Sequence, residues 1–329
     1  MNTKVPNIDY NEAIKNSGLF RKLGFVLFAV IVYRLGTYVP VPGINSAVLE
    51  QIFAQHQNGI LGIFDMFSGG ALMRMSVFTL GVMPYISASI IMTLMQSSFD
   101  SLKALKEQGT NGRKKIQQYT RYLTILLALF QSYGISNGIL NLSDTVDPTL
   151  GSVAFFQLSA IITMTSGTIF LMWLGEQITL RGVGNGISLI IFSGIVAEIP
   201  RALASTFELG RTGALSAVMI VGIFILVILT VLFIVFFERA MRKILINYPK
   251  RQVGNKMYGG ESSHLPLKIN TAGVIPAIFA SALLLLPITV SNFGMAESDT
   301  FLKISSMFTQ GQPLYMLLYA SGIIFFSFF

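Results

Sequence analysis

Residues 60–98 read ILGIFDMFSGGALMRMSVFTLGVMPYISASIIMTLMQSS, and this stretch decides the fold. It is apolar over most of its length, yet it is too long for one straight crossing, since about 20 apolar residues span the hydrocarbon core. Gly69-Gly70 and Pro84 interrupt it. Irregular backbone at membrane depth survives only where protein buries it or where it lines an aqueous cavity. We therefore predict a short re-entrant helix over residues 60–75, inside a helical bundle. Composition alone equally allows a surface helix at the outer interface.

The whole chain has the composition of a polytopic membrane protein. Of its 329 residues, 53% are hydrophobic and 12% charged, and the mean hydropathy is +0.66. A soluble domain carries about 25% charged residues, so these values exclude a soluble globular enzyme, a disordered chain and a fibrous repeat. The chain has no cysteine, which excludes disulfides, thiolate zinc sites and cysteine nucleophiles.

Eight apolar runs are candidates for membrane spans. They are residues 19–38, 73–98, 121–140, 155–174, 187–204, 215–237, 274–290 and 314–329. The first run is expected to persist as a span, because a rigid turn at Tyr38–Gly43 follows it instead of a small-residue cleavage site. The last run stops uncharged at Phe329, and we expect the protein to continue beyond it.

The distribution of lysine and arginine predicts the orientation of the spans. Eighteen of the 23 basic residues fall on the side of the N-terminus, chiefly in the loops between spans two and three and between spans six and seven. Three fall on the other side, and Arg34 and Arg74 lie in or beside spans. Positive charge collects in cytoplasmic loops. The net charge of +8 thus has a topological explanation, and the N-terminus is predicted to be cytoplasmic.

The spans contain almost no charge, which weakens the case for an ion-coupled transporter without excluding one. Arg34 lies about one turn from the outer end of the first span, where it can snorkel. The neutral polar residues within spans allow two interpretations, interhelical hydrogen bonds or a polar seam between helices that can part. They are Thr93, Gln96, Gln131, Asn137, Asn185 and Asn270.

The remaining motifs give no sign of catalysis. Residues 181–186, RGVGNG, lack the spacing of a nucleotide-binding loop and predict a tight turn. His56 and His264 are isolated and predicted to be solvated. The spans show no Ser–His pair and no paired carboxylates, so an intramembrane enzyme is disfavoured. The basic loop 238–268 is longer than a connection requires. It can be simply topogenic, or it can dock an acidic partner or ribosomal RNA.

Four long motifs, at residues 65–89, 113–122, 171–188 and 264–281, resemble the bacterial SecY family, whose members form the centre of a protein-conducting channel. The resemblance runs from about Leu19 to Phe329. It implies an all-α polytopic membrane protein, a SecY-type inverted-repeat bundle with here about 7.5 of the family's ten transmembrane helices. The implied halves are residues 1–204, with helices 1–5 and a plug at 60–75, and residues 205–329, with helices 6–8 and the cytoplasmic loop 238–268.

The resemblance also implies four sets of functional residues. The apolar pore ring would comprise Val82, Ile86, Ile187, Ile191, Ile275 and Ile278. The heart of the plug would comprise Phe64, Phe67, Ser68, Gly69 and Gly70. The lateral gate would include Ser87, Gln131 and Asn270. The partner-docking loop would present Lys250, Arg251 and Lys256.

The activity implied is that of a channel, which moves unfolded secretory proteins across the bacterial plasma (inner) membrane and releases hydrophobic segments laterally into the bilayer. Such a subunit is not an enzyme, needs no cofactor or metal, and takes its energy from a partner ATPase, the ribosome or the proton motive force. The partners implied are SecE, SecG, the SecA ATPase, the ribosome, preproteins bearing signal sequences, accessory SecDF and YidC, and membrane lipid. The alternative is a secondary transporter of a small solute.

Overall fold

A computed structural model of the chain describes residues 18–45, 48–49, 65, 68–140, 152–247, 251–253, 256–258, 262–273, 276–277, 279–281, 283–284 and 312–328. The chain divides into two compact units, Met1–Pro200 with Phe279–Gly322 and Arg201–Ile278 with Ile323–Phe329. The first boundary falls inside a helix, directly after Pro200. The division into inverted-repeat halves at residue 204 stays a prediction.

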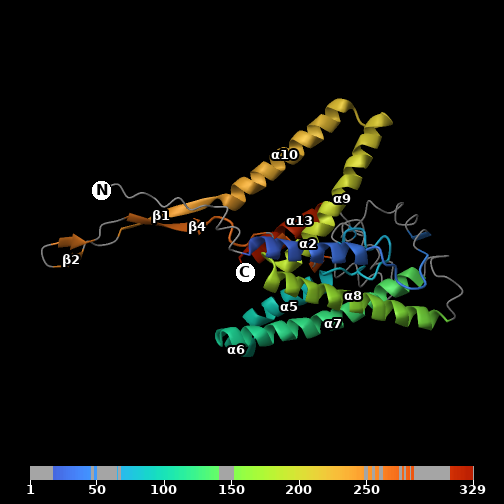
Figure 1. Cartoon of the computed structure of the whole chain (residues 1–329), viewed down its shortest axis with the longest axis horizontal. Helices are drawn as coiled ribbons and strands as arrows, with labels where there is room; N and C mark the ends of the chain where they lie inside the picture. The colour runs from blue at the N-terminus through green and yellow to red at the C-terminus, as the bar shows by residue number, and fades with distance from the viewer. Residues whose placement is uncertain are drawn as a thin grey trace. The chain divides into compact units, whose positions relative to one another are not determined.

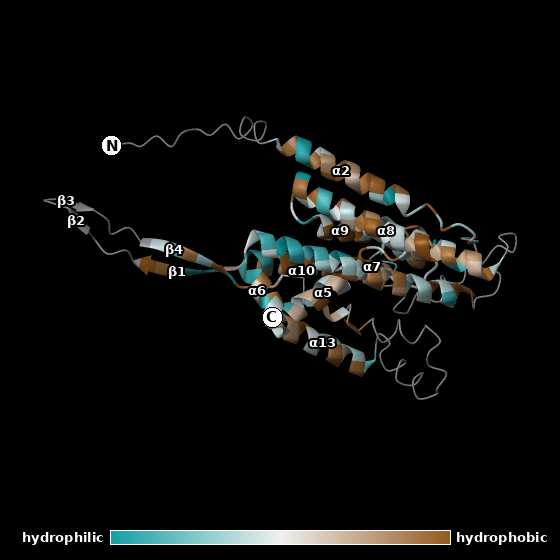
Figure 2. Cartoon of the chain, turned by 90° about the horizontal axis from the view of Figure 1, so that it is seen from below, coloured by the Kyte–Doolittle hydropathy of each residue, from teal (hydrophilic) through white to brown (hydrophobic). Residues whose placement is uncertain are grey.

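The first unit is a bundle of apolar helices (Figure 1). Its helices are α2 (Leu19–Gly36), α5 (Met83–Ser98), α6 (Asp100–Glu107), α7 (Thr110–Leu140), α8 (Val153–Arg181) and the first part of α9 (Gly186–Arg211). α7 packs along both α5 and α8, and α2 packs on α8. Figure 2 shows hydrophilic residues gathered on α6 and the adjoining end of α7, while apolar residues dominate α8.

The second unit holds the end of α9, helix α10 (Ala217–Arg239) and a β ribbon. α10 begins where the Ser216 hydroxyl accepts a hydrogen bond from the Met219 N–H at 3.3 Å, and none of its residues is buried. In the ribbon, β1 (Met241–Asn247) pairs antiparallel with β4 (Ser262–Lys268), and β2 (Arg251–Val253) pairs with β3 (Lys256–Tyr258). The last helix, α13 (Pro313–Ser327), is shared between the two units.

Most of the predicted spans are confirmed as helices. Four described helices, α7 to α10, are long and apolar enough to cross a membrane. α2 and α13 occupy the first and last predicted runs. α7 begins eleven residues before its predicted span, because the polar stretch before Arg121 continues the same helix. Most of the seventh predicted span, 274–290, lies outside the described residues.

One prediction about local structure is wrong. Span two was expected to begin at Met73 and to be interrupted at Pro84, but α5 begins at Met83 with Pro84 in its first turn. Proline lacks only an N–H that the first helical turn leaves unbonded anyway, so it starts this helix instead of breaking it. The basic loop 238–268, for which no secondary structure was predicted, contains the four strands of the β ribbon. Its isoleucine, valine and tyrosine residues suit strands.

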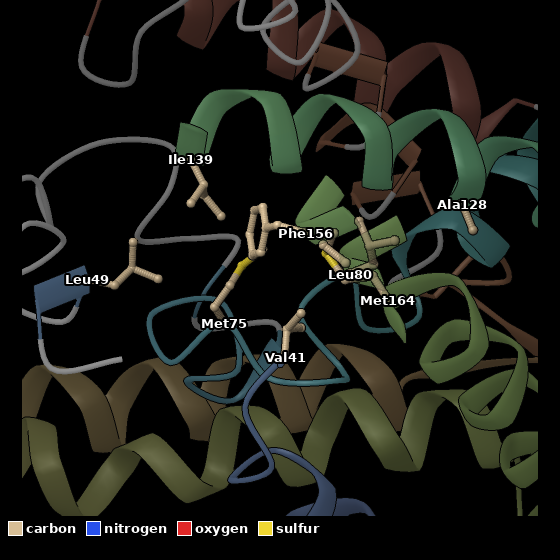
Figure 3. Packing of buried hydrophobic residues seen from close by; sticks show 9 residues of the cluster. Val41, Leu49, Met75, Leu80, Ala128, Ile139, Phe156 and Met164 are labelled. Atoms are coloured by element: carbon tan, nitrogen blue, oxygen red, sulfur yellow. The ribbon is translucent and has the colours of Figure 1, made fainter. Parts of the chain in front are cut away.

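A buried hydrophobic cluster joins the helices to the segments that precede α5 (Figure 3). The cluster comprises Val41, Leu49, Met75, Leu80, Ala128, Ile139, Phe156, Ala160 and Met164. Ala128 and Ile139 come from α7, and the last three residues come from α8. Val41, Leu49, Met75 and Leu80, which lie between α2 and α5, therefore pack inside the bundle against α7 and α8.

Glycines let this chain approach the helices closely. A methyl group added at Gly167 of α8 would collide with the Val77 carbonyl, and one added at Gly36 of α2 would collide with the Phe78 ring. By contrast, a methyl group added at Gly138 of α7 would meet no atom within 4 Å. The contact with α8 thus depends on the missing side chain at Gly167.

Gly167→Ala is expected to lower the stability of the bundle, whereas Gly138→Ala is not. Overpacking a closely packed site costs about 1–3 kcal/mol, because the Val77 backbone would have to move. In open space the same change stabilises a helix by up to about 1 kcal/mol. The thermal-unfolding midpoints of the two variants in detergent measure the difference. Equal midpoints would contradict the packing described for α8.

Candidate functional site

The site is the chain that runs through the bundle between Ser68 and Val82, here called the turn segment. Residues 69–82 form consecutive turns, with a single bridge residue at Ser76, and the predicted helix over 60–75 is wrong for residues 69–75. Gly69, Gly70 and Gly81 have φ angles of 67°, 80° and 55°. These left-handed conformations suit glycine and cannot continue a right-handed helix. The prediction that the segment re-enters the bundle is supported, because every residue in it except Arg74 and Val77 is buried. That burial contradicts the surface-helix alternative.

Asp65 organises the start of the turn segment. Its carbonyl accepts hydrogen bonds from the Gly70 N–H at 2.9 Å and from the Ser68 hydroxyl at 3.0 Å. Its Oδ1 accepts the Met73 N–H at 2.9 Å. Buried backbone groups without water must find such partners. The irregular backbone therefore satisfies part of its hydrogen bonding locally.

The loop after α2 satisfies more of it. The Val41 N–H donates to the Met75 carbonyl and the Val77 N–H donates to the Val39 carbonyl, both at 2.9 Å. Pro40 and Ser76 thereby form an antiparallel bridge. The turn segment and this loop are thus joined as one structural element.

An aromatic stack fixes the later part of the turn segment between α2 and α8. The Phe78 ring lies between Tyr33 and Phe170, with centroid separations of 6.0 Å and 5.8 Å and interplanar angles of 16° and 3°. Phe78 is buried, and buried aromatic rings are the largest apolar contributors to a core. This end of the segment is therefore anchored by apolar packing.

Polar contacts fix the earlier part. The Tyr33 hydroxyl donates to the Ser68 carbonyl at 2.9 Å, and Arg34 Nη1 donates to the Gly69 carbonyl at 2.6 Å. Arg34 was expected to snorkel toward the outer surface. Its side chain instead donates to the turn segment, where the buried Gly69 carbonyl needs a donor. A methyl group added at Gly69 would lie 2.9 Å from the Gly194 Cα of α9. Residues 68–70 thus lie between α2 and α9.

Charged groups surround the same turn. The Arg74 and Arg34 guanidinium carbons lie 4.4 Å and 5.6 Å from the centroid of the Tyr38 ring, within cation–π range. A methyl group added at Gly70 would lie 2.9 Å from Glu198 Oε1 and 3.4 Å from Arg74 Nη1. Burial raises the pKa of the Asp65 carboxyl, which lies outside the membrane-spanning helices. The hydrogen bond from the Met73 N–H lowers this pKa, and the negative charge of Glu198 raises it.

The predicted pore ring is described only in part. Val82 and Ile86 at the start of α5 and Ile191 on α9 are buried, and Ile187 is half-buried against Gly175 of α8. Ile275 and Ile278 lie outside the described residues, as do Phe64 and Phe67 of the predicted plug. Burial at the described positions is what a collar requires, and convergence of the ring on one axis stays a prediction.

The predicted lateral-gate residues fall in different units. Ser87 and Gln131 are buried in the first unit, and Gln131 Oε1 has no hydrogen-bond partner within the part of the chain that is described. Asn270 belongs to the second unit, where its side chain donates to Glu238 Oε1 at 2.9 Å and accepts the Gly273 N–H at 3.0 Å. Glu238 and Asn270 flank the two paired strands β1 and β4. The sequence analysis missed this contact because it assigned no strands here.

The docking residues are described by their backbone alone. Arg251 begins β2 opposite Tyr258, and Lys256 begins β3 opposite Val253, while Lys250 lies outside the described residues. Arg251 and Lys256 therefore lie in the short β2–β3 pair of strands, which stays a predicted docking surface.

An ion pair between α7 and α8 also escaped the sequence analysis. Arg121 donates to both carboxylate oxygens of Glu176, with Nε–Oε1 at 2.8 Å and Nη2–Oε2 at 2.7 Å. Such bidentate pairs are geometrically specific. In the sequence, Arg121 was counted only among the basic residues that set the topology. Because it and Glu176 are 55 positions apart, no local pattern predicts the pair.

Asp65→Asn is expected to leave the thermal-unfolding midpoint unchanged or to raise it, and Asp65→Ala is expected to lower it. Because the pKa of Asp65 is higher in the folded protein, its ionisation at neutral pH costs folding free energy. Asparagine removes that cost and keeps an Oδ1 acceptor for the Met73 N–H. Alanine leaves that buried donor unbonded, at about 1–3 kcal/mol. A destabilised Asp65→Asn variant would show that the carboxylate charge itself is required.

The chain is similar to proteins named as protein translocase subunits. The sequence model of the SecY family matches residues 76–329. The protein translocase subunit SecY of Rickettsia conorii is 50% identical over 318 residues, which cover 96% of this chain and 73% of that protein. The protein of the same name from Escherichia coli K12 is 49% identical over 329 residues, covering 99% and 74%.

Solved structures agree on the fold. A protein-conducting channel matches with a TM-score of 0.59 at 19% identity, over 83% of this chain and 59% of that one. Sec61 in the canine ribosome–channel complex matches with a TM-score of 0.58 at 19% identity. The chain thus spans less than two thirds of the length of these solved channels. The family match and the half-identical relatives over nearly the whole chain show that it belongs to the SecY family.

Proposed function

We propose that this chain is the channel-forming subunit of a protein translocase, through which unfolded secretory proteins cross the membrane and hydrophobic segments leave sideways into lipid. One observation carries the proposal beyond family membership. The turn segment is buried between α2, α8 and α9, as a displaceable stopper requires. The same family membership favours a channel over a secondary transporter of a small solute.

The proposed barrier to ions is an apolar collar with the turn segment beside it. Val82, Ile86 and Ile191 are buried aliphatic residues, which supports their place in the collar together with Ile187, Ile275 and Ile278. A narrow apolar constriction dewets and blocks ions, and flexible aliphatic side chains can seal around a passing polypeptide. The plug role extends from the described Ser68, Gly69 and Gly70 to Phe64 and Phe67.

The proposed exit to lipid is a gate lined by Ser87, Gln131 and Asn270. The buried and unbonded Oε1 of Gln131 supports this role, because a seam that parts offers new partners to its polar groups. A signal sequence would leave through the gap because burial of apolar area is favourable, at about 25 cal/mol per Å².

The proposed location is the plasma membrane of a bacterium, with the N-terminus in the cytoplasm. The bias of eighteen basic residues to three supports this orientation. The subunit would work with SecE and SecG and would draw its energy from the SecA ATPase, the ribosome or the proton motive force. SecDF and YidC would assist, and the β ribbon, with Lys250, Arg251 and Lys256, would dock the motor or the ribosome.

A stalled secretory chain is expected to crosslink to cysteines placed at Ile86 and Ile191, since both positions would line its path. Native cysteines give no background because the chain has none. Phe192, next to Ile191 on α9 and 61% exposed, provides a matched control position. Adducts at Ile86 and Ile191 but not at Phe192 are the expected result. Their absence at both positions would contradict the channel proposal.

Reversing the charge of Lys250, Arg251 and Lys256 to glutamate is expected to weaken binding of the motor or the ribosome at least tenfold at low salt. The effect should shrink as ionic strength rises, because exposed charges are screened. The control reverses Arg21 and Lys22 of α2 and Arg181 of α8, three exposed basic residues outside the ribbon. Equal losses in both variants would indicate a general electrostatic effect instead of a docking surface.

A further inference from the structure

Two adjacent side chains of α2 donate hydrogen bonds to two adjacent carbonyls of the turn segment. The Tyr33 hydroxyl donates to Ser68 and Arg34 Nη1 donates to Gly69, at 2.9 Å and 2.6 Å. Tyr33 is 1% exposed, so its hydroxyl has little access to water. A charged residue in a membrane span is costly and usually marks a function. The use of Arg34 to hold a backbone carbonyl therefore points to a role beyond packing.

Arg34 does not act as half of an ion pair. Within the described residues it forms no salt bridge, and its hydrogen-bond acceptor is the Gly69 carbonyl. The two carboxylates of this region, Asp65 and Glu198, lie close to the Arg74 guanidinium. The bond from Arg34 to Gly69 is thus a directed contact with the turn segment.

The side of residues 68–70 opposite α2 is formed by α9, whose Glu198 carboxylate lies near Gly70. Gly69 meets the backbone of Gly194 on α9, so close that an added methyl group would have no room. The Gly194 backbone leaves room for the segment but has no side chain that could donate a hydrogen bond to it. The described side chains that hold Ser68 and Gly69 come from α2.

The two ends of the turn segment are held in physically different ways. Met75, Phe78 and Leu80 are buried in apolar surroundings, and loss of such contacts exposes apolar area. The bonds at Ser68 and Gly69 can be exchanged for bonds to water at small net cost. Gly69 and Gly70, which tolerate both signs of φ, connect the two regions.

We propose that Tyr33 and Arg34 are positioning residues that form a releasable polar latch on Ser68 and Gly69, holding residues 68–70 against α9 while residues 75–80 stay anchored. The latch rests on the proposed function, because its release would free the stopper at its glycine end. It predicts that weakening either donor exposes Ser68 without loosening the apolar core.

The test measures how fast a hydrophilic maleimide labels a cysteine at Ser68, in the full chain reconstituted into lipid vesicles without substrate or partner proteins. Ser68 is 3% exposed, and the chain has no other cysteine. A second reporter, Ala128→Cys in the core of α7, detects general loosening, since Ala128 is fully buried. Each reporter is combined with Tyr33→Phe, Arg34→Met or Arg34→Lys.

Tyr33→Phe keeps the ring that stacks on Phe78 and removes only the hydroxyl, so labelling at Ser68→Cys should rise about threefold to tenfold. Arg34→Met removes a charged donor, and the rise should be about tenfold to a hundredfold. Arg34→Lys keeps a charged donor and should fall between the native protein and Arg34→Met. Tyr122→Phe, which removes an exposed hydroxyl bonded to Gln118, should change nothing.

An unchanged labelling rate in Arg34→Met would overturn the latch, and so would an equal increase at Ala128→Cys, which would mean that Arg34 only stabilises the bundle. Because no substrate is present, the result does not depend on transport. Unchanged labelling together with nascent-chain adducts at Ile86 would reject the latch alone. Increased labelling without such adducts would reject the channel and retain the latch.

Discussion

The need to hydrogen-bond an irregular backbone away from water is the constraint on which the rest of this structure depends. Helices meet that need internally, but the turn segment does so only in part. It draws its partners from Asp65, from the loop at residues 39–41, and from two side chains of α2. The surrounding helices must in turn leave room, which explains why Gly36, Gly167 and Gly194 face it.

The same constraint explains why the two ends of the segment differ in strength. Burial of a large apolar side chain is worth about 1.5–3 kcal/mol. A neutral hydrogen bond such as that of Tyr33 contributes about 1 kcal/mol net and one from a charged donor such as Arg34 about 1.5–3 kcal/mol, but water offers an equivalent partner when either breaks. Phe78 lies between two rings, but Ser68 and Gly69 meet donors and a bare glycine backbone. A segment built this way can be released from one end while the fold persists.

The sequence predicts features that depend on composition along the chain, and it fails where the outcome depends on packing. Apolar length located most helices, and the glycine pair marked the re-entrant segment. Pro84 was misjudged because the same residue can break a helix or begin one, and the preceding turns decide which. The contacts Arg121–Glu176 and Glu238–Asn270 join residues 55 and 32 positions apart, so they follow only from the helix and strand pairings.

Small polar residues distinguish the helices that are buried against other helices from α10, which is exposed along its length. The most apolar window of α8 is 50% buried, and that of α10 is not buried at all, although α10 has the higher mean hydropathy. The buried faces of α7 and α8 carry hydroxyls that bond to their own helix backbone, such as Thr124 and Thr168, and Ser132 lies 3.2 Å from Thr165 across the two helices. In lipid there is no hydrophobic force between helices, so close packing of small residues and shared hydroxyl contacts must join them. α10 has few such residues and a uniformly apolar surface. Small residues and hydroxyl contacts therefore determine which helices pack around the turn segment. Hydropathy alone determines which helices can lie in the membrane.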